Sequence, residues 1–406
     1  MTVVSAPFAP IDFAAFHRDE LPRRLAAGNG ALAARGATRL RSLAFRLPDG
    51  AAYTYVPAEG AISVVPGDAA ADTVIELQPE LWRNFVNELD AAAGLLYGGR
   101  ARCLRGKAIR WLDWEPALRA MLQGRPVYDA ERLALTDRRG APLDAAAVFA
   151  LDSDRLDMAH FLRTAGYLFV RDVFRAEEIA GFLAESEALR AEAVPGDKLS
   201  WWGKRGGDAV LCRVTRAGAK PGLRSIPGDP RLLSLIALAD EPLVHRNKGS
   251  QEEGVSVIWK QPGVDEGLGD LPWHRDCGMG GHAIMCPVLI ASVFLTPSTP
   301  ETGDLRMLPG SWQSGCGPID ARHPKAPRGV SFAARPGDVS LHYGDTMHAA
   351  PPPERSDLAV YRTSAVTGYA REGVRPHRGR HYNEVLHGRD DGQVEHLARV
   401  AERAED

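Results

Sequence analysis

Short stretches of alternating apolar and polar residues predict β-strands in the first part of the chain. The clearest pair, residues 42–47 and 51–56, is joined by Pro48-Asp49-Gly50. An Asp-Gly turn between two alternating stretches indicates a hairpin, because its backbone twist matches that of paired strands. Two further strands are expected at residues 60–65 and 72–77.

Helical spacing, with apolar residues three or four positions apart, predicts helices around these strands. The expected ranges are 12–34, 79–93 and 115–122. Pro79 suits the first turn of the second helix, whose apolar stripe consists of Trp82, Phe85, Val86 and Leu89. Residues 1–128 therefore predict an α+β domain, and residues 129–150 read as a linker.

The rest of the chain predicts a mainly β domain over residues 151–390, followed by a helical tail at 391–406. Buttressing helices are expected at 152–163 and 175–191, with a buried strand between them. From residue 255 onward, short apolar strands alternate with turns rich in Gly, Pro and Asp. This pattern is typical of a jelly roll, in which strands distant in sequence lie side by side around one interior.

Residues 195–230 interrupt the regular pattern with glycines, basic residues and the pair Trp201-Trp202. A long irregular loop in a compact domain is commonly a lid or a substrate-binding element, which makes Trp201, Trp202 and Arg213 candidate substrate contacts. Arg213 and its basic neighbours can hold an acidic substrate group. The alternatives are that the tryptophans cap a core edge and that the basic residues are solvated surface.

Composition narrows the class of protein. A chain of 406 residues predicts two domains, and a hydrophobic content of 45% with a net charge of −3 describes a soluble globular protein. The charge balance gives no indication of nucleic-acid binding. No run of eighteen apolar residues and no secretory signal is found, so we expect no membrane span and a cytoplasmic location. The oligomeric state is left open.

The five cysteines are few, scattered and without a Cys-x-x-Cys pair, which argues against a disulfide framework and a structural zinc site. They are Cys103, Cys212, Cys277, Cys286 and Cys316. Cys277 follows Asp276, but its position along a strand turns it away from a metal bound by Asp276.

The strongest chemical pattern is His274-Arg275-Asp276 together with His348. Side chains two apart on a strand share a face, so His274 and Asp276 can bind one ion while Arg275 faces away. Two imidazoles and a carboxylate on one side of an octahedron suit iron(II) that also binds a chelating cosubstrate and dioxygen. His-x-Asp by itself is a weak pattern that also fits a polar loop, and His342 competes with His348 for the role of second histidine.

Several further motifs, in order, resemble the phytanoyl-CoA dioxygenase family of iron(II)/2-oxoglutarate oxygenases over about residues 150–385. They are His274-x-Asp276, Gly303-Asp304-Leu305-Arg306-Met307-Leu308-Pro309-Gly310-Ser311, Pro336-Gly337-Asp338, His348 and Arg362, and an upstream segment at 161–174. Residues 1–128 are similar in pattern to a sterol-carrier-protein-like domain, which holds lipids in an apolar tunnel. The alternative is a small α+β domain that only packs on the catalytic one.

The family resemblance implies a double-stranded β-helix, with His274, Asp276 and His348 as metal ligands and catalytic centre. It also implies Fe(II), 2-oxoglutarate and O2 as cofactor and cosubstrates. Arg362 would bind the 5-carboxylate of 2-oxoglutarate with two parallel hydrogen bonds, with Arg355 as second choice. The other expected cosubstrate contacts are Lys260, Arg275 and Thr296. The family often has glutamine where this chain has Arg275, which leaves that contact open.

The resemblance further implies oxidation of an unactivated carbon, usually hydroxylation, with release of succinate and CO2. Halogenating relatives carry a small residue at the position of Asp276, so the carboxylate argues against halogenation. The expected substrate is a small organic or lipid-like molecule. Two alternatives remain: a cupin-like metal hydrolase or isomerase that uses no 2-oxoglutarate, and a lipid-binding or transfer protein without turnover.

Overall fold

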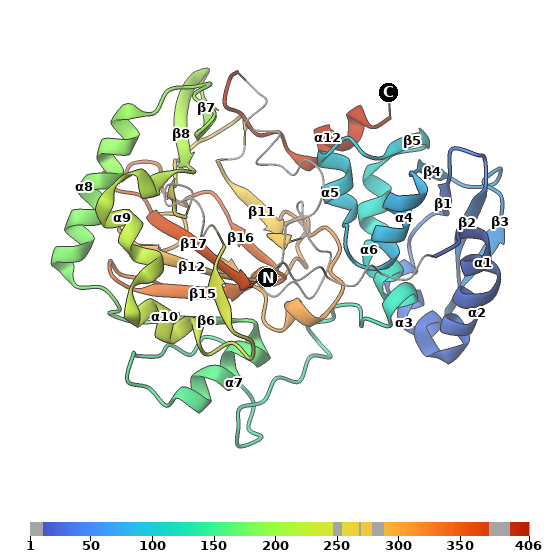
Figure 1. Ribbon diagram of the computed structural model, residues 1–406, viewed down its shortest axis with the longest axis horizontal. Helices are drawn as coiled ribbons and strands as arrows, with labels where there is room; N and C mark the ends of the chain where they lie inside the picture. Colours follow the sequence, from blue (N-terminus) through green and yellow to red (C-terminus); the bar gives the residue numbers. More distant parts are fainter. Residues whose placement is uncertain (1–10, 247–253, 268, 278–287, 373–389, 406) are drawn as a thin grey trace.

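The computed structural model describes residues 11–405 except 247–253, 268, 278–287 and 373–389 (Figure 1). Its described strands form a five-stranded, an eight-stranded and a four-stranded sheet. Within these sheets the named strands pair antiparallel, apart from one parallel pair in the five-stranded sheet. The mainly antiparallel architecture with flanking helices agrees with the sequence prediction.

The five-stranded sheet belongs to the N-terminal part and has the order β3-β2-β1-β4-β5. Its strands are β1 (Leu43–Arg46), β2 (Ala52–Ala58), β3 (Ala61–Pro66), β4 (Thr73–Glu76) and β5 (Arg102–Arg105). The predicted hairpin is confirmed, since β1 and β2 pair antiparallel across a turn in which Gly50 has φ 93°. β1 pairs with β4 in parallel, so the chain crosses over after β3.

Helices pack on this sheet (Figure 1). The first helical run consists of α1 (Phe13–Ala15), η1 (Phe16–Glu20), α2 (Leu21–Arg24), η2 (Leu25–Asn29) and α3 (Gly30–Ala37). The others are α4 (Pro79–Val86), α5 (Ala92–Tyr97) and α6 (Ile109–Gln123). The helix expected at 79–93 is two helices, because Glu88 takes a left-handed φ of 59° between them. The helix expected at 115–122 begins earlier, at Ile109, because Trp111 and Leu112 are buried in the same core.

The end of the chain returns to this N-terminal part. Helix α12 (Leu397–Arg403) lies beside α5 in Figure 1, and its Val400 and Ala401 are buried in the same hydrophobic cluster as α5 and α6. The amide of Cys103 donates to the carbonyl of Ala404 over 2.7 Å. The predicted helical tail therefore completes the N-terminal core.

The two-domain division stays a prediction, which the separate hydrophobic clusters of the two parts support.

The other two sheets form the jelly roll. The large sheet has the order β6-β15-β12-β17-β10-β8-β7, with β9 paired to β17, and the small sheet has the order β11-β16-β13-β14. Their bounds are β6 (Tyr167–Val170), β7 (Ser200–Arg205), β8 (Asp208–Val214), β9 (Leu243–His245), β10 (Ser256–Trp259), β11 (Leu271–His274), β12 (Val288–Phe294), β13 (Arg306–Met307), β14 (Val330–Ser331), β15 (Val339–Tyr343), β16 (His348–Ala350) and β17 (Thr363–Arg371). From β10 to β17 the chain thus passes back and forth between two facing sheets, with the consecutive β13 and β14 both in the small sheet, as in a double-stranded β-helix.

Helices cover the outer face of the large sheet (Figure 1). They are α7 (Arg155–Ala165), α8 (Ala176–Glu192), α9 (Pro221–Ser225) and α10 (Pro230–Ile236), with 3-10 turns η3 (Ala217–Ala219), η4 (Ile226–Gly228) and η6 (Ser311–Gln313). Alternate strand residues, such as Val257, Ala291 and Leu341, point into this helix-covered core. The residues between them face the small sheet and line the interior of the jelly roll.

The prediction of a long irregular loop at residues 195–230 is wrong. The segment forms the β7–β8 hairpin followed by short helices, and the hairpin extends the large sheet beyond β10. Gly206 and Gly207, both with positive φ, form its two-residue turn. A Gly-Gly pair between two apolar stretches is a hairpin signal that the prediction overlooked.

Among the described helices, none combines the length and the apolar character that crossing a lipid bilayer requires. Four cysteines lie in the described part of the chain and none of them forms a disulfide; Cys286 lies outside it.

A buried histidine lies in the N-terminal core. His17 is 4% exposed; its Nδ1 donates to the carbonyl of Phe13 and its Nε2 accepts from the hydroxyl of Tyr55, both over 2.7 Å. Its ring stacks on Tyr53 at 4.0 Å. Burial lowers the pKa of His17 to about 4, against the opposing effect of the Phe13 carbonyl. His17 is therefore neutral in the folded protein at ordinary pH.

We expect the folded state to lose stability as the pH falls from 6.5 towards 4. In this window the unfolded chain binds a proton at His17 and the folded chain does not, so the free energy of unfolding falls, by up to about 3 kcal/mol. Urea unfolding followed across this window should show a smaller pH slope in His17→Gln than in the natural protein. His323→Gln, at an exposed histidine, is the control and should keep the natural pH slope. A slope in His17→Gln equal to that of the natural protein would contradict the conclusion that His17 is buried in its neutral form.

Candidate metal and cosubstrate site

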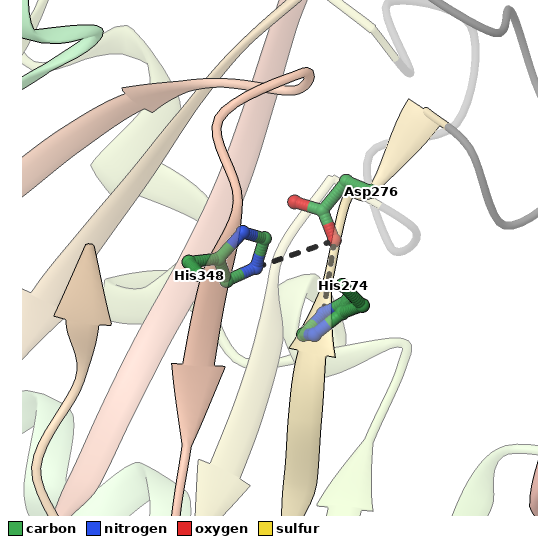
Figure 2. A group of neighbouring side chains, drawn as sticks. All are labelled: His274, Asp276 and His348. Atoms are coloured by element: carbon green, nitrogen blue, oxygen red, sulfur yellow. Dashed lines mark ion pairs between the residues drawn. The ribbon is translucent and has the colours of Figure 1, made fainter. Parts of the chain in front are cut away.

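Two strands of the small sheet bring the predicted metal ligands together. β11 ends at His274, Asp276 follows it, and β16 begins at His348. The strands pair antiparallel with His274 directly opposite His348. Figure 2 shows all three side chains converging between the two strands, although 72 residues or more separate His348 from the other two in sequence. The jelly-roll connection therefore produces the juxtaposition that the sequence pattern required.

The three side chains have the separations of a metal site. Nε2 of His274 and Nε2 of His348 each lie 3.8 Å from Oδ1 of Asp276, and the two imidazole rings are 4.2 Å apart. One candidate ligand atom from each residue lies within 4.8 Å of the others. Atoms that bind one ion at about 2 Å each can be spaced in this way.

Backbone carbonyls fix the tautomer of both histidines. Nδ1 of His274 donates to the carbonyl of Pro272 over 2.8 Å, and Nδ1 of His348 donates to the carbonyl of Thr346 over 2.9 Å. The unprotonated Nε2 of each ring is therefore directed at Asp276. A carbonyl that holds the second ring nitrogen is a common arrangement for a metal-binding histidine.

The protonation states also suit a cation. Burial, reinforced by the neighbouring imidazoles, lowers the pKa of His274 and of His348 to about 4. Burial opposes the ionisation of Asp276, but His348 and the hydrogen bond from His342 outweigh it and lower the pKa of this carboxyl. Near neutral pH the site offers two neutral imidazoles and one carboxylate, the protonation states in which they bind metal.

His342 occupies a position next to the ligands. Its Nε2 lies 3.4 Å from Oδ2 of Asp276, the oxygen that does not face the other two histidines, and its ring is 4.4 Å from that of His348. The structure thus separates the two competing histidines by their contacts: His348 shares Oδ1 with His274, whereas His342 binds Oδ2. The parity of β15 (Val339–Tyr343) directs His342 inward, a signal that the sequence analysis did not use when it weighed His342 against His348.

The Pro-Gly-Ser motif holds His348 in place. Oγ of Ser311 accepts the amide of Met347 over 2.8 Å, and the amide of Leu308 donates to the Met347 carbonyl over 2.9 Å. The hydroxyl of Thr346 donates to the carbonyl of Gly166 over 2.7 Å. These bonds fix the backbone on the N-terminal side of His348, so the motif positions a ligand.

Arg362 immediately precedes β17 and is 5% exposed. Burial lowers the pKa of its guanidinium to about 10, although Asp304 and Asp270 act in the opposite direction. Within the described part of the chain, no hydrogen bond from this guanidinium is found, and its Nε is buried without a partner. A buried guanidinium that lacks a partner is costly, so an anionic ligand is the expected partner here.

The backbone around Arg362 is held tightly. Its carbonyl accepts the amide of Lys260 over 2.8 Å, and its own amide donates to Thr302 over 3.1 Å. The hydroxyl of Thr296 accepts the amide of Thr363 over 2.6 Å and donates to Tyr361 over 2.7 Å. Thr296, expected to touch the cosubstrate, therefore bonds to the residues on either side of Arg362.

Lys260 and Arg275 find partners within the protein. Nζ of Lys260 forms an ion pair with Asp270 and donates to the carbonyl of Ala350 over 2.6 Å. Burial lowers the pKa of Lys260 to about 8 despite Asp270. The Arg275 guanidinium points away from the metal ligands and donates to the Ser311 carbonyl over 3.2 Å and to the Ser314 carbonyl. No contact in the described structure supports a cosubstrate role for either residue.

The remaining predicted residues are placed as follows. Arg355, the second choice for the carboxylate-binding arginine, is exposed and pairs with Asp357 over 2.6 Å. Trp201 is buried on β7, and Nε1 of Trp202 donates to Oγ of Ser200 over 2.7 Å. Arg213 stacks on Trp201. Asp270, the partner of Lys260, was not predicted, because an aspartate before a strand has no distinguishing pattern.

Comparison with known proteins decides the family. The family model for phytanoyl-CoA dioxygenase (PhyH) matches residues 162–357, which include all three metal-site residues. This part of the chain belongs to the phytanoyl-CoA dioxygenase family. The expectation of an iron(II)- and 2-oxoglutarate-dependent oxygenase domain is thereby confirmed. No curated protein matches the chain.

Solved structures similar to the chain include AviO1 from Streptomyces viridochromogenes Tue57, at 25% identity and a TM-score of 0.43, covering 55% of this chain and 98% of that one. The epimerase SnoN from nogalamycin biosynthesis, described as non-heme and alpha ketoglutarate dependent, is 22% identical with a TM-score of 0.42, covering 55% and 93%. EctD from S. alaskensis, solved with 2-oxoglutarate and 5-hydroxyectoine, is 21% identical with a TM-score of 0.44, covering 63% and 85%.

Substitutions should distinguish the candidate ligands His274 and His348 from their neighbour His342. We expect His274→Ala and His348→Ala each to abolish stoichiometric iron(II) binding, because each removes a nitrogen that faces Oδ1 of Asp276. His342→Ala removes a partner of Asp276 and should weaken binding by about 10- to 100-fold. Anaerobic titration with iron(II) measures all three. Undiminished binding by His348→Ala would show that the ligand set is wrong.

Proposed function

We propose that the protein is a non-haem iron(II)/2-oxoglutarate-dependent dioxygenase that hydroxylates an unactivated carbon of a small organic or lipid-like substrate and releases succinate and CO2. One observation carries the proposal beyond metal binding. A buried arginine without a partner, Arg362, lies inside the same jelly roll as the three candidate ligands. A metal site alone does not need such a residue.

The residues present fit the proposed metal and cosubstrate. His274, Asp276 and His348 would hold iron(II), and they leave three coordination positions for other ligands. Arg362 would bind the distal carboxylate of 2-oxoglutarate through its planar guanidinium. When bound, the metal and cosubstrate supply the activation of dioxygen and the oxidation of the substrate.

The protein's own groups supply position and charge. The Nδ1 bonds to Pro272 and Thr346 keep both Nε2 atoms directed at one point. His342 occupies Oδ2 of Asp276 and leaves Oδ1 for the metal. Fixed ligands of this kind lower the cost of reorganising the site when it binds its cosubstrate.

Arg362 also favours the proposal over its alternatives. A hydrolase or isomerase with the same three ligands has no need for a second buried cation to hold a dicarboxylate. For the lipid-transfer alternative, the centre of the N-terminal core is filled by large side chains packed on one another, with the Phe85 and Trp111 rings 5.2 Å apart. We propose that the N-terminal part is a separate α+β domain, and we assign it no ligand.

Replacement of Arg362 should affect the cosubstrate and spare the metal. We expect Arg362→Lys to weaken 2-oxoglutarate binding by about 100-fold, because lysine keeps the charge but loses the two parallel hydrogen bonds. Arg355→Lys is the matched control, since its guanidinium is paired at the surface. Anaerobic calorimetry with iron(II) present measures both.

The proposed reaction is tested by succinate formation. The iron-loaded protein should convert 2-oxoglutarate to succinate under air, slowly without substrate and faster with one.

Two results would contradict these expectations. Equal 2-oxoglutarate affinity in the natural protein and in Arg362→Lys, measured by the calorimetry above, would contradict the role of Arg362. Iron binding without any 2-oxoglutarate binding would favour the hydrolase or isomerase.

A further inference from the structure

The β7–β8 hairpin places an arginine on the inner face of the large sheet. Val257 of β10 points into the helix-covered core, so its neighbours Ser256 and Ile258 point the other way, toward the small sheet. Arg213 of β8 is the partner of Ile258 in the sheet register, and Trp201 of β7 is the partner of Arg213. Residues opposite one another in a sheet share a face. Both side chains therefore lie on the inner face.

The packing of Trp201 supports this orientation. Trp201 is 4% exposed and forms a hydrophobic cluster with Val394, and Leu271 of β11, a strand of the opposite, small sheet, packs against this cluster. A cluster that includes Trp201 of the large sheet and is packed by Leu271 of the small sheet lies between the two sheets. Since β11 continues from Leu271 to the metal ligand His274, this part of the hairpin faces the strand that carries the metal site.

The sheet register also gives the position of Arg213 along the strands, between Arg362 and the candidate metal site. Its terminal nitrogen donates to Oγ of Ser256 over 3.0 Å. The sheet register aligns Ser256 with Val366, Ser292 and Ser340 on the neighbouring strands. His342 lies two residues beyond Ser340 on the same face, whereas Arg362 lies at the other end, beside Lys260. The side chain of Arg213, which is paired with Ile258, thus extends towards Ser256. This direction leads away from Arg362 and towards the end of the sheet that carries His342.

The guanidinium of Arg213 has little to neutralise it. It stacks over the Trp201 ring at 4.7 Å, its Nε is buried without a hydrogen-bond partner, and it forms no ion pair with any carboxylate of the described residues. Two other cations on the inner face differ from it: Lys260 is paired with Asp270, and Arg362 has the proposed 2-oxoglutarate carboxylate. A partly buried guanidinium without an ion-pair partner, held over an indole ring, is suited to a carboxylate, which it can bind with two hydrogen bonds.

We propose that Arg213, positioned by Trp201 and Ser256, binds a carboxylate of the substrate, so that the enzyme acts on a small organic acid. The inference rests on the proposed function, because it places this substrate beside the proposed iron and 2-oxoglutarate. It adds the substrate class, which the metal ligands leave open. A purely structural role for Arg213 makes a different prediction: its replacement would change stability and leave ligand preference unaltered.

The test compares acids with their amides. The full chain, loaded anaerobically with iron(II) and saturating 2-oxoglutarate, is titrated by calorimetry with pairs such as hexanoate and hexanamide, decanoate and decanamide, and phenylacetate and phenylacetamide. Members of a pair differ in charge and scarcely in shape. We expect at least one acid to bind about 10- to 100-fold more tightly than its amide, as a charge-assisted contact predicts.

Variants locate this preference. Arg213→Met keeps the length of the side chain and should reduce the ratio of acid affinity to amide affinity to near one without changing 2-oxoglutarate affinity. Arg213→Lys should reduce this ratio several-fold. If the methionine variant does not fold, the lysine variant tests whether Arg213 binds the carboxylate. Arg205→Met, at the exposed end of the same hairpin, is the control and should keep the natural ratio.

Three outcomes would overturn the inference: no acid preferred by the natural protein, a preference that survives in both Arg213 variants, or a loss of 2-oxoglutarate binding in Arg213→Met. The last would make Arg213 a cosubstrate residue. Failure of the natural protein to bind iron(II) or 2-oxoglutarate is detected in the preparatory titrations. That result would refute the proposed function itself, and it is distinguishable from a loaded enzyme that shows no preference for acids.

Discussion

The antiparallel pairing of β11 with β16 is the constraint on which the site depends. It places His274 opposite His348, and the carbonyls of Pro272 and Thr346 then direct both Nε2 atoms at Asp276. Each of these strands is short, so the pairing has little stability of its own. Its geometry is maintained by the bonds from Ser311 and Leu308 to Met347 and by the jelly roll as a whole.

A second constraint is the distribution of charge along the interior. Lys260 is neutralised by Asp270, whereas the guanidinium groups of Arg362 and Arg213 have no carboxylate bonded to them within the described structure. Arg362 is buried and Arg213 is partly buried, so each of the two positions in the jelly roll favours an anionic ligand. The proposed cosubstrate accounts for one of them, and the proposed substrate carboxylate accounts for the other.

The sequence predicted the elements whose signals are local. Asp49-Gly50 identified a hairpin, and His-x-Asp identified two of the three candidate ligands. The strand parity used for that pair does not hold as stated, because β11 ends at His274 and Asp276 lies in the turn after it. The long loop at 195–230 was wrong because mixed composition hid a hairpin whose Gly206-Gly207 turn is its clearest mark. The break at Glu88 also escaped prediction, since a left-handed glutamate has no sequence signature. Partners distant in sequence, such as Asp270 for Lys260 and the helix α12 for the N-terminal core, become known only from the fold.

The central claim is that one iron(II) ion is bound by His274 at the end of β11, by Asp276 just after it and by His348 at the start of β16. Crystals of the full chain grown anaerobically with iron(II) and 2-oxoglutarate, measured at the iron absorption edge, test it most directly. The account predicts one anomalous peak in contact with Nε2 of His274, Nε2 of His348 and Oδ1 of Asp276. An iron peak bound by His342 in place of His348, or one located away from β11, would contradict it.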